Sequence, residues 1–392
     1  MKRLFSLLAI ISLVLAAALA ISFFAPLPIP YYQDFSVMYF TDKGLLNHIP
    51  IYNYPAQLEF VRGLTGPDFV FHPYPYPPWY ALATCLLSWL PIEVAARMWF
   101  LLNLGMIALS AWLLTPRFRP MQRILGVLAA IMFIPTFGLL VVGQYSAPVL
   151  LGAALFIRAA GRKSAGWTAV ALLLMTFKPH IGGLLFLAGG LWLLLEKAPF
   201  ARRALWFTLG GGLLLAALGF LADASWPLSY IQSLGLYRDI PGVQTCGLCA
   251  SLSVALVRLV TGQSNTLQAV GVALFLALAA GGLLFWRLGP VFVGKGVWLM
   301  QPGALMALAG VLTLLIDPYL LNYDYILLLV PIFQLARRGW PVWLVYFIPW
   351  STLFLGRNGN VILALAGLVT FFLILSQPID ALRREAYNDS NN

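Results

Sequence analysis

Hydrophobic residues in this chain form long runs that are separated by short polar breaks. A helix needs about 20 apolar residues to cross the roughly 30 Å hydrocarbon layer of a bilayer. Long runs, without the alternation of a β-barrel, predict an all-α, polytopic transmembrane bundle of about 11–13 helices. The predicted helices after the first are 79–90, 94–114, 124–142, 147–160, 167–177, 181–195, 204–222, 267–286, 297–316, 325–336, 342–355 and 361–375.

The first apolar run, 4–24, follows a basic N-terminus and ends before a cluster of prolines. Residues 18–20 (Ala-Leu-Ala) are similar to a signal-peptide cleavage site, so a cleaved signal peptide is an alternative. The run is longer than the ~7–15 apolar residues of an ordinary signal peptide, which favours an uncleaved membrane anchor.

The composition is typical of a membrane protein, and the positions of the basic residues explain the positive net charge. Hydrophobic residues make up 61% of the 392 positions and charged residues 9%, which excludes a soluble or disordered chain. The net charge of +11 comes from short basic loops, typical of cytoplasmic loops, and predicts no nucleic-acid partner. These loops lie at 2–3, 117–123, 158–163, 197–203, 287–295, 337–338 and 383–384. We therefore expect a multi-pass protein of the cytoplasmic membrane with a cytoplasmic N-terminus.

The intervening loops hold eight of the 13 acids: Asp34, Asp42, Glu59, Asp68, Asp223, Asp239, Asp317 and Asp324. We expect a single domain, 1–392, with long outer loops at about 25–78 and 223–251. Loops of this length are uncommon unless they have a function. The number of membrane crossings is a problem at 79–114. This segment contains two apolar runs, whereas the charges of the loops on its two sides predict an odd number of crossings. Either 79–90 does not cross, or the basic loop at 117–123 breaks the charge rule.

Few polar residues in these outer loops could carry chemistry. Asp34 is flanked by aromatic residues, where desolvation can raise a carboxyl pKa and suit a general base; the alternative is an ordinary interfacial acid. Lys178 separates two apolar runs beside Pro179 and could bind a phosphate, or simply snorkel to the interface. Gln144 lies in a polar break at 143–146, where a turn or cap residue is the alternative. Asp324 precedes an apolar run and could be a helix N-cap.

Other chemistry is less well supported. Cys246 and Cys249 form a CxxC motif in an outer loop, which favours a local disulfide or two free thiols over a redox centre. The three histidines lack metal-site spacing, so we expect no metal. P-loop, G-x-G-x-x-G and G-x-S-x-G motifs are absent. Apart from Glu93, acids are absent from the middles of the apolar runs, which argues against an ion-coupled transporter.

Short motifs recur in order along 33–331. They are Gln33-Asp34-Phe35-Ser36-Val37-Met38-Tyr39, the stretch 44–52, Tyr74-Pro75-Tyr76-Pro77-Pro78, Gly143-Gln144-Tyr145-Ser146, Phe177-Lys178-Pro179 and Tyr323-Asp324-Tyr325. Their order resembles that in the integral-membrane GT-C glycosyltransferases, and most closely in glycosyltransferase family 87, which includes polyprenol-phosphate-mannose-dependent mannosyltransferases. Ser146 stands where that family has Asn, and Asn322 or Tyr323 where it commonly has His.

This resemblance implies a GT-C-like fold and a hexosyltransferase, with mannose as the sugar, that acts at the extracytoplasmic face. Its partners would be a polyprenyl-phosphate-linked sugar donor, a glycolipid or glycan acceptor and membrane lipids, with no cofactor. Asp34 would be the general base of an inverting, metal-independent displacement. Lys178, and secondarily Arg238, would bind the donor phosphate, because the departing phosphate needs positive charge. The remaining substrate-binding candidates are Tyr76, Gln144, His180, Asn322, Tyr323 and Asp324.

Two other functions remain open at this stage. A lipid-linked-sugar transporter or flippase would use a similar amphipathic cavity without needing Asp34 as a base. A surface-polysaccharide polymerase or ligase would transfer a whole glycan instead of one sugar.

Overall fold

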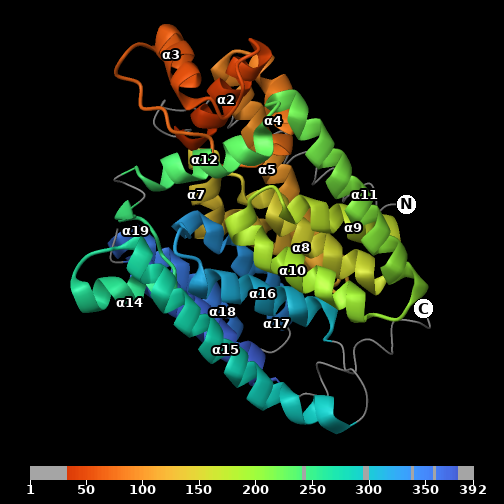
Figure 1. The fold of residues 1–392 in the computed structure, drawn as a ribbon. Helices are drawn as coiled ribbons and strands as arrows, with labels where there is room; N and C mark the ends of the chain where they lie inside the picture. The colour runs from red at the N-terminus through yellow and green to blue at the C-terminus, as the bar shows by residue number, and fades with distance from the viewer. Residues whose placement is uncertain (1–32, 241–243, 295–299, 337–339, 356–358, 378–392) are drawn as a thin grey trace.

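The computed structural model describes residues 33–240, 244–294, 300–336, 340–355 and 359–377 (Figure 1). The predicted first span, and with it the choice between anchor and signal peptide, lies outside these residues. Within them the chain is helical, and the β-type pairing is an isolated bridge between Cys249 and Leu321. The predicted all-α class is confirmed.

The helices follow the predicted apolar runs closely. The first half of the chain contains α2 (Gln33–Leu46), α3 (Tyr54–Thr65), α4 (Pro78–Thr84), the 3-10 helix η2 (Cys85–Trp89), α5 (Ile92–Leu114), α6 (Pro120–Met132), α7 (Ile134–Val142), α8 (Ser146–Gly161), α9 (Ala165–Met175) and α10 (Pro179–Leu195). The second half contains α11 (Pro199–Ala222), α12 (Trp226–Arg238), α14 (Leu252–Thr261), α15 (Thr266–Gly294), α16 (Pro302–Ile316), η3 (Asn322–Leu328), α17 (Leu329–Leu335), α18 (Trp340–Phe347), η5 (Ile348–Ser351), α19 (Thr352–Leu355) and α20 (Gly359–Leu375).

In the part of the chain that the structure describes, three helices are long and apolar enough to cross a membrane, namely α5, α11 and the part of α15 from Thr266 to Leu284. Helices α6 and α7 form a fourth candidate, bent by 57° at their junction. Shorter apolar helices, including α8, α9, α10, α16 and α20, fill the space between them. This is the architecture of a polytopic helical membrane protein.

The helices in 79–90 are too short to cross a membrane, which favours the first of the two alternatives for this segment. Helix α4 has only seven residues and is followed by the 3-10 helix η2. Seven residues of α-helix extend about 10 Å, far short of a bilayer. In the segment 79–114, α5 is therefore the helix of spanning length.

The two predicted outer loops contain helices. The first supplies α2 and α3, and the second supplies α12. Together with α4 and η2 these helices form a layer at one end of the molecule, at the top of Figure 1, which we call the cap. The cap has an apolar core formed by aromatic residues such as Phe35, Tyr39 and Tyr80, to which Trp99 of α5 also contributes.

The main core lies below the cap and is built on α8 and α16. Helix α8 packs against α5 and α9, and α16 packs against α10 and α20. Small residues permit these close contacts. A Cβ at Gly152, for example, would lie 2.8 Å from the carbonyl oxygen of Ala171 on α9.

Two predicted helices are interrupted. The run 325–336 begins in the 3-10 helix η3 and becomes α-helical only in α17, where Pro331 lies near the start. The run 342–355 is divided into α18, η5 and α19 around Pro349. Proline lacks an amide hydrogen and clashes with the preceding turn, so a continuous helix is disfavoured at both places.

Candidate active site

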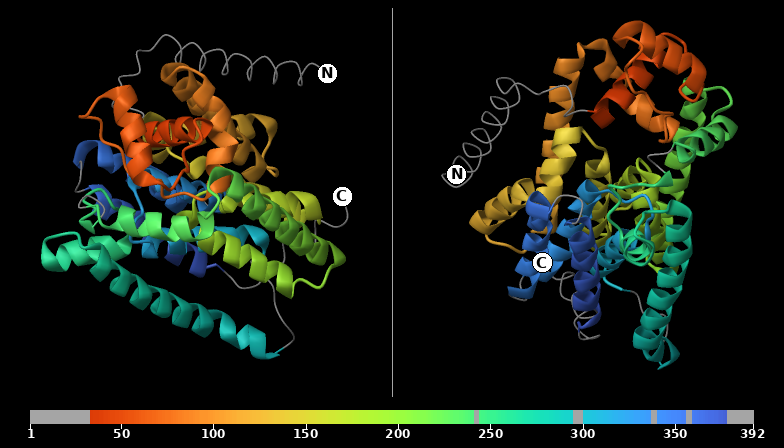
Figure 2. Two further views of the ribbon diagram at one scale, coloured as in Figure 1. Left: turned by 45° about the horizontal axis from the view of Figure 1, so that its top comes forward. Right: turned by 90° about the vertical axis from the view of Figure 1, so that its left-hand side faces the viewer.

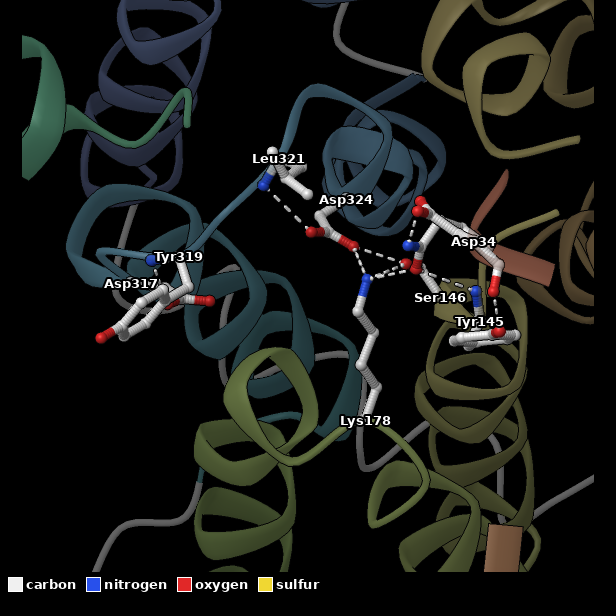
Figure 3. Close-up of polar contacts among 9 residues, drawn as sticks. Asp34, Tyr145, Ser146, Lys178, Asp317, Tyr319, Leu321 and Asp324 are labelled. Atoms are coloured by element: carbon white, nitrogen blue, oxygen red, sulfur yellow. Dashed lines mark hydrogen bonds and ion pairs between the residues drawn. The ribbon is translucent and has the colours of Figure 1, made fainter. Parts of the chain in front are cut away.

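Lys178 lies at the junction of α9 and α10 and is buried, with 1% of its surface exposed. Its Nζ donates hydrogen bonds to Asp324 Oδ1 at 2.6 Å, to Ser146 Oγ at 3.0 Å and to Gln144 Oε1 at 3.0 Å (Figure 3). An ammonium group has three N–H donors, and all three are used. The snorkelling alternative therefore does not describe this lysine.

Asp324 is fully buried in η3 and neutralises Lys178. Its Oδ1 accepts hydrogen bonds from Lys178 and from the Ser146 hydroxyl, and its Oδ2 accepts one from the Leu321 amide at 3.1 Å. The predicted N-cap role is thus wrong: Leu321 is the N-cap of η3, and Asp324, at the third position of η3, accepts from the N-cap amide while it pairs with Lys178. A buried ion pair is tolerated because each charge is compensated and hydrogen-bonded.

Gln144 connects this ion pair to Asp34. While its Oε1 accepts from Lys178, its Nε2 donates to Asp34 Oδ2 at 2.6 Å. Gln144 follows Gly143, whose φ of 72° is in the left-handed region that favours glycine. A Cβ at Gly143 would lie 2.6 Å from Phe35 Cβ, so this glycine also allows α2 to approach closely.

Asp34 is half-buried in the first turn of α2. Burial raises the pKa of its carboxyl, while the hydrogen bond from Gln144 and the charge of Lys178 oppose that rise. Its Oδ1 has no hydrogen-bond partner among the residues that the structure describes. A carboxylate with a raised pKa and a free oxygen is suited to accept a proton.

Aromatic residues surround Asp34. The Tyr145 hydroxyl donates to the Asp34 main-chain oxygen, and the Tyr145 ring meets Tyr76 edge-on at 4.7 Å between ring centroids. Burial lowers the pKa of His72, and the negative charge of Asp34 partly offsets this effect. His72 is therefore close enough to Asp34 for their charges to interact. Sequence reasoning overlooked both Tyr145 and His72 as site residues. Tyr145 could have been suspected from its place beside Gln144, whereas nothing in the sequence distinguished His72.

Tyr323 belongs to the same cluster, since Lys178 Nζ lies 4.8 Å from the centre of its ring. The neighbouring Asn322 is exposed and lines, together with Tyr323, a cavity that also includes Ile134 and Asn360. Arg238 is also exposed and pairs with Asp239 at 3.0 Å. The structure therefore joins Tyr323, but neither Asn322 nor Arg238, to Lys178 by direct contact.

His180 lines a cavity of about 420 Å³ between α10, α15 and α16. Apolar side chains such as Leu184 and Leu274 form most of its wall, and Asp317 and Tyr319 complete it. Burial raises the pKa of Asp317 to about 8, and its Oδ2 has no partner among the described side and main chains. Helix α15 runs along the edge of the molecule in every view, and little of its apolar part is buried (Figure 2). One wall of this cavity is thus formed by a helix at the edge of the molecule.

No cluster of three or more potential metal-binding side chains occurs within the described ranges. The positive charge in the cluster is that of Lys178. Its geometry brings a proton acceptor, Asp34, and a cation into one hydrogen-bonded network through Gln144. Such a network can deprotonate a nucleophile at one end and stabilise an anion at the other.

The comparisons with known proteins identify the family of the chain. The model of glycosyltransferase family 87 matches residues 74–318, which is well over half of the chain. The matched range includes Gln144 and Lys178, whereas Asp324 lies six positions after its end and Asp34 lies 40 positions before its start. No curated protein and no solved structure matches the chain. This helical membrane protein is therefore a glycosyltransferase and belongs to glycosyltransferase family 87.

Proposed function

We propose that the protein transfers a hexose, specifically mannose, from a polyprenyl-phosphate donor to a lipid-linked or glycan acceptor at the extracytoplasmic face of the cytoplasmic membrane. The observation that carries this proposal is the bridge formed by Gln144 between Asp34 and Lys178. It supplies a base and a cation at the two ends of one amide side chain. A base held near the hydroxyl and a cation held near the phosphate both favour the displacement of a sugar phosphate by a hydroxyl.

In this mechanism Asp34 removes the proton from the acceptor hydroxyl through its free Oδ1. The acceptor oxygen then forms a bond to the anomeric carbon, and the bond between that carbon and the phosphate oxygen breaks. The polyprenyl phosphate leaves with the electron pair. One displacement inverts the anomeric centre, so a β-linked donor gives an α-linked product.

Lys178 stabilises the charge that develops on the leaving phosphate. Because its three donors are already used, a phosphate oxygen would replace one of the neutral acceptors, Gln144 or Ser146, and leave Asp324 in place. The lysine supplies the cation, so the proposed displacement uses no metal ion. If the phosphate took the place of the Gln144 oxygen at Lys178, the hydrogen bond from Gln144 to Asp34 would also weaken. The Asp34 carboxylate would then be a stronger base.

The cavity beside α15 supports a lipid-linked donor. It is mostly apolar, one wall belongs to α15, which is long and apolar enough to cross a membrane, and its lining includes His180 and Asp317. Asp317 and Lys178 are close enough for their charges to influence each other. A prenyl chain in this cavity would therefore bring its phosphate toward Lys178, and His180 and Tyr319 would contact the head group.

The test is a transfer assay on purified protein in lipid vesicles, with radiolabelled polyprenyl-phosphate mannose and a glycolipid extract. We expect Asp34→Asn to lower the transfer rate roughly 10²–10⁴-fold, the usual contribution of a general base. The matched control is Asp68→Asn, which neutralises an exposed acid in the same segment and should keep the rate. An Asp34→Asn variant with the wild-type rate would exclude the mechanism, and transfer from another lipid-linked hexose alone would exclude mannose.

A further inference from the structure

The CxxC motif forms a disulfide in the segment between α12 and α14. Cys246 and Cys249 are bonded across a separation of three positions, and Cys249 is buried, with 1% of its surface exposed. The proposed mechanism uses neither residue. Their location beside the active site nevertheless suggests what the disulfide does.

The segment that follows the disulfide is hydrogen-bonded to both sides of Asp324. Cys249 and Leu321 form the antiparallel bridge, and the Ala250 amide donates to the Leu320 oxygen at 2.8 Å. On the other side of Asp324, the buried Tyr325 hydroxyl donates to the Ala250 oxygen at 2.8 Å. Residues 249–250 therefore hold the turn 320–325 at two points.

The same turn orients the buried carboxylate. The Leu321 amide donates to Asp324 Oδ2, while Asp324 Oδ1 accepts from Lys178. Leu321 thus pairs with Cys249 on one side and directs Asp324 on the other. Direct contacts therefore connect the disulfide to the Lys178 ammonium, from Cys249 to Leu321, from Leu321 to Asp324 and from Asp324 to Lys178.

The outer part of the CxxC loop is also held in place. The Asn360 side chain donates to the Leu248 oxygen at 3.2 Å, and the Arg258 guanidinium donates to the Gly247 oxygen at 3.1 Å. A cross-link within such a short loop removes backbone conformations that the reduced loop could visit. Cys249 would otherwise be free to leave its bridge with Leu321.

We propose that the Cys246–Cys249 disulfide is a positioning element of the active site, which holds the turn 320–325 and thereby keeps Asp324 and Lys178 in register. This inference rests on the proposed role of Lys178 at the donor phosphate. It makes sugar transfer sensitive to reduction at a site that contains no reacting atom. A disulfide persists in an oxidising compartment, which agrees with the extracytoplasmic face proposed for this end of the molecule.

The first experiment measures hydrogen–deuterium exchange of the purified protein in lipid vesicles, with and without dithiothreitol. The reagent converts the disulfide into two thiols and is itself oxidised to a cyclic disulfide. We expect faster exchange in peptides that contain Leu320–Tyr325 and unchanged exchange in α8. A Cys246→Ser/Cys249→Ser variant should show the fast exchange without reductant, and Cys85→Ser, which removes a free thiol, should behave as wild type.

The second experiment measures sugar transfer by the same proteins. A misplacement of ~1 Å can cost about 100-fold in rate, so we expect kcat to fall at least roughly 10-fold on reduction, with the acceptor KM unchanged. The double variant should start at the lower rate and no longer respond to reductant. Unchanged exchange at 320–325, or faster exchange with an unchanged kcat, would overturn the inference. Absence of transfer by the oxidised wild type from every donor counts instead against the proposed function, and the exchange result still decides whether the disulfide holds the turn.

Discussion

At the scale of single residues, the site depends on charges that are buried and compensated. Lys178 and Asp324 are both almost completely inaccessible, and each satisfies the other. Removal of one partner leaves an uncompensated buried charge, whereas removal of both can be nearly neutral. Stability and catalysis can therefore be separated by experiment at this pair.

We expect Lys178→Met to destabilise the protein by about 3–5 kcal/mol, because Asp324 then lacks its counter-charge. The double variant Lys178→Met/Asp324→Leu should recover most of the melting temperature, measured in detergent, but should not transfer sugar. Lys197→Met, at an exposed lysine in the turn before α11, is the control and should change neither property. If the double variant transferred sugar at the wild-type rate, Lys178 would have no role at the donor phosphate.

At the scale of elements, turns between helices place the polar groups. Gln144 follows α7, Lys178 precedes α10, and Asp324 lies in η3 where the chain is not α-helical. Helix interiors satisfy their own backbone groups, so the breaks are where side chains and main-chain amides remain available. The left-handed turn at Gly143 is one such constraint, because α2 packs directly on it.

We expect Gly143→Ala to lower both the melting temperature and the transfer rate. An L-residue in this conformation costs roughly 1–2 kcal/mol, and the new methyl group would also displace Phe35, the neighbour of Asp34. Gly161→Ala is the control, since a Cβ there meets no atom within 4 Å. Equal melting temperatures and rates for the two variants would show that the contact between Gly143 and α2 is unimportant.

At the scale of the whole molecule, the cap and the peripheral helix α15 define two approaches to the site. The cap brings Asp34 down onto the α7–α8 turn, while the cavity between α10, α15 and α16 is lined by His180, two positions after Lys178. An acceptor that enters beneath the cap and a lipid donor that enters past α15 would meet at Gln144. The two substrates would not need to share an entrance.

We expect Leu274→Trp, on the cavity side of α15, to raise the KM for a long-chain donor about 10-fold, equivalent to ~1.4 kcal/mol of binding. The KM for a donor with a short prenyl chain should not change, because such a chain would not reach the obstruction. Leu278→Trp is the matched control on the same helix, at an exposed position that does not line the cavity. An equal effect of Leu274→Trp on both donors would place the prenyl chain elsewhere.

Much of this protein could be predicted from its sequence. Apolar runs predict which helices are buried in lipid or in the core, and prolines and glycines predict where a helix ends. Both signals can be read from sequence because their effects are local to the segment in which they occur. The residues Asp34, Gln144, Lys178 and Asp324 could be singled out for a related reason. Polar groups between apolar runs are costly to retain without a use.

Only the tertiary structure decided which of these residues meet. Gln144 is 110 positions from Asp34, and Lys178 is 146 positions from Asp324, so contact depends on how helices pack and not on any local pattern. The same packing paired Arg238 with Asp239 and left Asn322 exposed at the cavity that contains Asn360, although both were candidates in sequence. It also joined the disulfide loop to the Asp324 turn. Hydrophobicity determines that a helix is buried, whereas close contact between small residues of particular helices determines its neighbours.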